Sequence, residues 1–224
     1  MLEKLAKQTA VYGISTIAVR FLSYLLTPVF TRVFEPEAYG IVTDVYALIP
    51  FALVVLTMGL ESAYFRFAAK ADAAAAAAGG TEGEIAAQAR AGKRRLFATA
   101  WGVTLLAASL FFLLTAFGRE RVAEWMGEAY VAHPEYVLLV AAVVWFDVAA
   151  CLPFSRLREQ GRAMTFVGIK ALGVVVNVAL AIGFALAGLY GTPFGVGWVF
   201  VANLIASAVT FNVILLTTDR TVPR

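Results

Sequence analysis

The sequence predicts an all-helical integral membrane protein, a single domain whose helices cross a lipid bilayer six times. Of its 224 residues, 61% are hydrophobic and only 15% are charged, whereas soluble proteins are about a quarter charged. The mean hydropathy is +0.81. A water-soluble fold of this length has too little interior to bury so many apolar side chains. The chain is therefore expected to reside in a lipid bilayer.

Each spanning helix needs about 20 mostly apolar residues. Residues 171–218 carry no charge but are too long for one helix, and the Gly/Pro-rich stretch 188–197 divides them. Pro50 is expected to bend the second helix. The predicted spans cover residues 8–34, 37–68, 96–117, 135–156, 165–187 and 198–217.

The segment 69–92 has low complexity, with six consecutive alanines followed by Gly79 and Gly80. Its composition predicts a flexible cytoplasmic Ala/Gly-rich loop between the second and third spans. The basic run Lys93–Arg95 follows it and would anchor the third span at the lipid headgroups.

Lys and Arg are unevenly distributed between the predicted loops. Only Arg32, Arg119 and Arg121 lie on one side, and the remaining loop charges, with Lys170 counted among them, lie on the other. Cytoplasmic loops carry the excess of positive charge in membrane proteins. We therefore expect a multi-pass protein of the inner (cytoplasmic) membrane with both termini in the cytoplasm.

The sequence contains no enzyme signature. One cysteine (Cys151) and one histidine (His133) cannot form a disulfide within the chain or a metal site, and no phosphate-binding glycine loop is present. The positive net charge is explained by loops that fix topology, so no nucleic-acid partner is implied. We expect no catalytic residue, no metal and no cofactor.

Arg20 lies near the middle of the first predicted span, too deep to reach either membrane surface. Tyr24 and Thr27 share its face, within a stripe of Thr, Tyr and Ser residues spaced three or four apart. A charge at mid-bilayer needs a partner or a water-filled cavity. Either Arg20 forms part of a cavity wall that binds an anion such as a diphosphate, or it pairs with Asp44.

Three carboxylates lie within predicted spans: Asp44, Glu61 and Asp147. Each could bind a cation, exchange a proton, or only neutralise a basic residue. Arg66 could extend to the membrane interface. In the last two spans, polar and small residues that share a helix face are expected to hold helices together. These are Lys170, Gly173 and Asn177 on one span and Asn203, Ser207 and Thr210 on the other.

The pattern P-x-x-T-R-x-F-x-P-x-x-Y-G at Pro28–Gly40 resembles the start of polysaccharide biosynthesis membrane proteins. The segments Gly59–Phe67 and Arg156–Ala163 are similar to the end of that family's second helix and to its loop between helices four and five. These proteins are the O-antigen and lipid-linked oligosaccharide flippases of the multidrug/oligosaccharidyl-lipid/polysaccharide exporter superfamily.

The resemblance implies one six-helix lobe of a two-lobe MATE-like flippase. Such a protein translocates a polyprenyl-diphosphate-linked oligosaccharide across the cytoplasmic membrane by alternating access. Arg20 and Arg66 would bind the diphosphate. The implied partners are the substrate, membrane lipids and a second six-helix lobe, because the sequence ends at Thr221–Arg224 just after the sixth predicted span.

Three other functions remain open. A cation-coupled multidrug extruder of the same superfamily would use Asp44, Glu61 and Asp147 in its cavity. A membrane glycosyltransferase or ligase acting on the same lipid carrier would need larger outer loops than 32–37, 118–135 and 188–197. A non-transporting fragment or membrane subunit would carry no transport activity.

Overall fold

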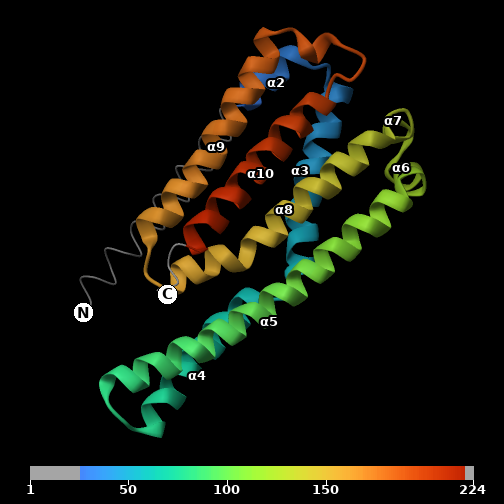
Figure 1. The fold of residues 1–224 in the computed structure, drawn as a ribbon. Coiled ribbons are helices and arrows are strands. Elements are labelled where there is room, and N and C mark those ends of the chain that lie inside the picture. The colour runs from blue at the N-terminus through green and yellow to red at the C-terminus, as the bar shows by residue number, and fades with distance from the viewer. Residues whose placement is uncertain (1–25, 220–224) are drawn as a thin grey trace.

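The computed structural model describes residues 26–219, and its helices confirm the predicted all-α membrane bundle (Figure 1). Helices α6 and α7 occupy the predicted outer loop 118–135, and η1 is a 3-10 helix in the loop before α10. The elements in this part of the chain are α2 (Thr27–Val33), α3 (Pro36–Thr57), α4 (Leu60–Ala78), α5 (Glu82–Phe117), α6 (Arg119–Met126), α7 (Glu128–Val131), α8 (Pro134–Glu159), α9 (Ala163–Leu186), η1 (Leu189–Gly191) and α10 (Gly197–Asp219).

Within the described residues, five segments are long and apolar enough to cross a membrane. Helices α3 and α4 together form the first, and α5, α8, α9 and α10 are the others. Most of the predicted first span, residues 8–34, lies outside the described residues, and α2 corresponds to its C-terminal end. The chain is thus a multi-pass membrane protein.

The second predicted span is interrupted between α3 and α4. Helix α3 continues past Pro50 to Thr57, and the chain then takes the left-handed conformation at Met58 (φ 49°) and Gly59 (φ 69°). Gly59 adopts this conformation freely because it has no Cβ. Met58 has a Cβ, and the left-handed conformation costs such a residue about 1 kcal/mol. The interruption sets the position of α4 and of Glu61, in its first turn.

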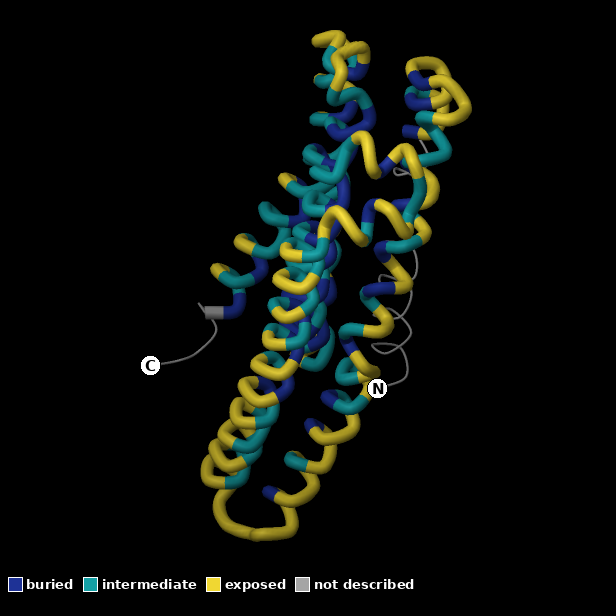
Figure 2. Tube along the Cα trace, turned by 90° about the vertical axis from the view of Figure 1, so that its right-hand side faces the viewer, coloured by how far each residue is buried: buried dark blue, intermediate teal, exposed yellow. Residues whose placement is uncertain are grey.

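The predicted loop 69–92 is wrong, because these residues are helical except for 79–81. Alanine has the highest helix propensity of all residues, so the alanine run extends α4. Thr81 then starts α5 with a capping box, in which the Thr81 amide donates to Glu84 Oε2 at 2.8 Å. Helices α4 and α5 form a hairpin that projects from the bundle with exposed outer faces (Figure 2).

Helix α8 is the centre of the bundle and packs against α3, α4, α5, α9 and α10. In its most apolar window 67% of the residues are buried, compared with 33% or less in the other spans. Small and β-branched side chains such as Val144, Val148 and Ala149 allow these neighbours to approach closely. Lys93 of α5 forms two salt bridges of 2.7 Å: one to Asp72 of α4 within the hairpin, and one to Glu159 that attaches the hairpin to α8.

Candidate substrate cavity

A cavity of about 680 Å³ lies between α2 and α3 on one side and α8, α9 and α10 on the other. Apolar residues such as Phe30, Ile49 and Val174 form part of its wall. The polar lining is unusually rich for the interior of a membrane bundle. It comprises Thr27, Tyr39, Thr43, Tyr46, Asp147, Lys170, Asn177, Asn203, Ser207 and Thr210.

The two charged residues among the described residues of the lining come from consecutive helices. Asp147 lies near the middle of α8 and lines the cavity together with Ser207 of α10. Lys170 lies two turns into α9, where its ammonium is 4.2 Å from the centre of the Phe154 ring. Lys170 and Asp147 are close enough to attract each other electrostatically. The described part of the lining therefore combines one cation, one carboxylate and neutral hydrogen-bonding groups.

Close packing of α9 against α10 shapes one wall of the cavity. Thr210 Oγ1 donates to the Ala206 carbonyl at 2.8 Å, and the hydroxyl lies against Gly173 of α9. A Cβ added at Gly173 would overlap Thr210 Oγ1. Gly173 therefore leaves room for the Thr210 hydroxyl at this approach, as small residues commonly do in membrane helix pairs.

Replacing Gly173 by alanine is expected to push α9 away from α10 and to destabilise the protein by about 1–3 kcal/mol, the usual cost of overpacking. Gly183→Ala is the matched control, because a Cβ at Gly183 of the same helix meets nothing within 4 Å. Thermal unfolding in detergent should show a lower Tm for Gly173→Ala only. Equal Tm values for the two variants would contradict the packing role.

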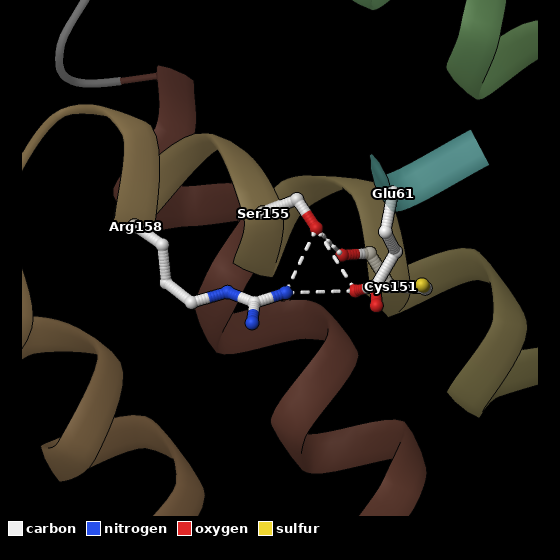
Figure 3. A network of polar contacts seen from close by, with 4 residues as sticks. All are labelled: Glu61, Cys151, Ser155 and Arg158. Atoms are coloured by element: carbon white, nitrogen blue, oxygen red, sulfur yellow. Dashed lines mark hydrogen bonds and ion pairs between the residues drawn. The ribbon is translucent and has the colours of Figure 1, made fainter. Parts of the chain in front are cut away.

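A second polar cluster joins α4 to the C-terminal end of α8 (Figure 3). Arg158 Nη2 donates to Glu61 Oε1 at 2.9 Å and to Ser155 Oγ at 3.2 Å. Ser155 Oγ lies 2.9 Å from the same Glu61 oxygen and 3.1 Å from the Cys151 carbonyl oxygen. The Arg158 guanidinium also faces the rings of Phe65 and Phe166. This cluster ties the first turn of α4 to α8.

The structure brings two of the residues predicted from sequence, Thr27 and Asp147, to the cavity. Glu61 belongs to the α4–α8 cluster. Arg66 and Asp44 are exposed, and they do not line the cavity. Arg20 and Tyr24 lie outside the described residues. Their roles in substrate binding, and the pairing of Arg20 with Asp44, stay predictions.

Lys170, Asn177, Asn203 and Ser207 line the cavity, although the sequence suggested only a loop charge and helix packing for them. Counting Lys170 among the loop charges was wrong, since it lies inside α9. One signal was present in the sequence. Lys170, Gly173 and Asn177 share a helix face with steps of three and four residues, so a charge and an amide point the same way.

Comparison with known proteins identifies the family. A family model described as polysaccharide biosynthesis protein matches residues 5–223. No curated protein and no solved structure matches the chain. The match covers nearly the whole sequence and confirms the resemblance seen in the residues of the N-terminal segment. The chain belongs to the polysaccharide biosynthesis protein family.

Proposed function

We infer that the chain has a role in membrane transport for polysaccharide export, which its family membership and apolar helices support. We propose that the chain forms part of a flippase that moves polyprenyl-diphosphate-linked oligosaccharides across the cytoplasmic membrane by alternating access. The observation that carries this proposal is the polar cavity between the helices, with Lys170 in its wall.

The cavity suits the head group of such a lipid. The Lys170 ammonium can hold a phosphate oxygen, because charge-assisted hydrogen bonds to phosphate are strong. Asn177, Asn203 and Thr210 offer donors and acceptors for sugar hydroxyls. A volume of about 680 Å³ falls within the range of about 300–1,000 Å³ typical of ligand sites. The polyprenyl chain would remain in the bilayer.

Alternating access in this proposal needs a second lobe, because the two lobes rock against each other around the substrate. A second six-helix lobe or another copy of this chain would supply it, with membrane lipids around both. The protein would carry out no covalent chemistry on the substrate, and we propose that it is not an enzyme.

Native mass spectrometry of the protein with its co-extracted lipids tests the proposal. We expect a retained mass that matches a polyprenyl diphosphate bearing sugars, and its loss when inorganic pyrophosphate competes. Lys170→Gln should retain less of this lipid than the unchanged chain. Retention of only uncharged or zwitterionic lipids by both proteins would overturn the proposal.

Asp147 favours one alternative, a cation-coupled multidrug extruder, because a carboxylate in the cavity could bind a cationic drug. Ethidium binding followed by fluorescence distinguishes the two functions. The flippase proposal expects no ethidium binding that depends on Asp147. Saturable binding lost in Asp147→Asn would favour the extruder.

The orientation of the helices can be tested with single cysteines in a Cys151→Ala background. Ala87 in the α4–α5 hairpin, Ala129 in α7 and Ala187 after α9 are all exposed. From the distribution of Lys and Arg, we expect a membrane-impermeant maleimide to label Ala129→Cys and Ala187→Cys in intact cells. Ala87→Cys should react only after permeabilisation. The reverse pattern would refute the cytoplasmic placement of the hairpin.

A further inference from the structure

Asp147 and Lys170 form an open pair of opposite charges in the cavity. Both residues line it, from α8 and α9, and each lies in the electrostatic field of the other. The described ion pairs within 4.0 Å do not include them, so their charged atoms lie farther apart than a closed salt bridge. A ligand oxygen can therefore reach Lys170 without first breaking a salt bridge to Asp147.

The two charges balance each other in surroundings of low dielectric constant, where an uncompensated charge is costly. A diphosphate that enters this electrically neutral pair brings at least two negative charges. It binds the Lys170 ammonium but meets repulsion from the Asp147 carboxylate. The repulsion disappears if Asp147 becomes neutral, so anion binding and neutralisation of Asp147 favour each other.

We propose that Asp147 takes up one proton when a diphosphate binds Lys170, so that substrate binding and proton binding are coupled at this cavity. This inference rests on the proposed function, in that the ligand is an isoprenyl diphosphate. The proton comes from the buffered solvent that reaches the cavity and ends on a carboxyl oxygen of Asp147. On release of the diphosphate, Asp147 returns it and again compensates Lys170. No bond of the substrate breaks.

Other ionisable groups lie near Asp147 and Lys170, so a group other than Asp147 has to be considered as the one that takes up the proton. Glu61 of α4 and Cys151 and Arg158 of α8 act electrostatically on Lys170. Of these neighbours, Glu61 is held by Arg158 and Ser155 in the α4–α8 cluster. Asp147 is then the one carboxylate among the described residues of the cavity wall. Within residues 26–219, the remaining ionisable groups of the lining are the phenols of α3, Tyr39 and Tyr46.

Isothermal titration calorimetry of the full chain with farnesyl diphosphate measures this coupling. The titration is done at one pH in two buffers of different ionisation enthalpy, which yields the number of protons taken up. We expect an uptake larger by about one proton per diphosphate in the unchanged chain than in Asp147→Asn. Protonation of the diphosphate itself is common to both proteins and cancels in the difference.

Cys151→Ala is the control, because Cys151 lies one helical turn from Asp147 but outside the cavity lining. It should take up as many protons as the unchanged chain. If Asp147→Asn fails to fold, infrared difference spectra of the unchanged chain serve instead. Addition of farnesyl diphosphate should produce a protonated-carboxyl band that Glu61→Gln retains.

Each outcome separates the two proposals. Binding that needs Lys170 but shows equal proton uptake with and without Asp147, or no carboxyl band, would overturn the coupling and leave the flippase proposal intact. Absence of farnesyl diphosphate binding to the unchanged chain would overturn the diphosphate site, and the coupling with it. Binding with Asp147-dependent uptake would support both.

Discussion

Replacing Lys170 by glutamine is expected to weaken isoprenyl diphosphate binding about a hundredfold, because truncating one partner of a buried charge pair costs about 2–5 kcal/mol. Lys170 is the only basic residue among the described residues that line the cavity. Glutamine preserves hydrogen bonding and approximate length but removes the charge. The dissociation constant for farnesyl diphosphate, measured by calorimetry, checks this prediction.

Two further variants decide whether the charge itself binds the ligand. Lys170→Arg should restore most of the affinity, since it keeps the cation and adds a planar fork of donors. Lys70→Gln is the matched control, because Lys70 is exposed on α4 beside the Phe67 ring and outside the cavity. A Lys170→Gln variant that binds as tightly as the control would place the diphosphate elsewhere.

The fold class could be predicted from sequence because it depends on the length and hydropathy of local segments. Bilayer thickness fixes the length of a span, so the hydrophobic runs that contain α8, α9 and α10 can be recognised by their length and hydropathy. The hairpin 69–92 could not be predicted from its low complexity. Composition suggested a flexible segment, but the helix propensity of alanine and the Thr81 cap decide its structure.

The cavity could be predicted only in part, because it depends on which helix faces meet. Asp147 could be predicted as a candidate site residue because it is a single carboxylate in an apolar span. Lys170 lies only seven residues after the start of α9, where sequence alone does not separate a loop charge from a cavity charge. Asn177 and Ser207 have the same residue types as ordinary helix contacts. Only the three-dimensional arrangement shows that they surround an open space.

Reversing the charge of Glu61 is expected to lower the yield of folded protein. Glu61→Arg would place a guanidinium beside that of Arg158, where the native carboxylate oxygen lies 2.9 Å away (Figure 3). Like charges brought together here repel, and the repulsion is partly screened because the Arg158 and Glu61 side chains are 35% and 40% exposed. A cost of about 1–2 kcal/mol is still a sizeable share of the stability of a typical domain, about 5–15 kcal/mol. Arg158→Glu should be equally damaging, because it leaves two carboxylates facing each other.

Combining Glu61→Arg with Arg158→Glu should restore folding in part, because the charges are again opposite. Recovery should be incomplete, since Arg158 also faces the Phe65 and Phe166 rings and a carboxylate there loses both cation–π contacts. Glu124→Arg, at an exposed carboxylate of α6, is the control and should fold normally. Fluorescence-detected size-exclusion chromatography reports the folded yield of all four variants. A double variant as poorly folded as the singles would show that the contact between α4 and α8 depends on shape rather than charge.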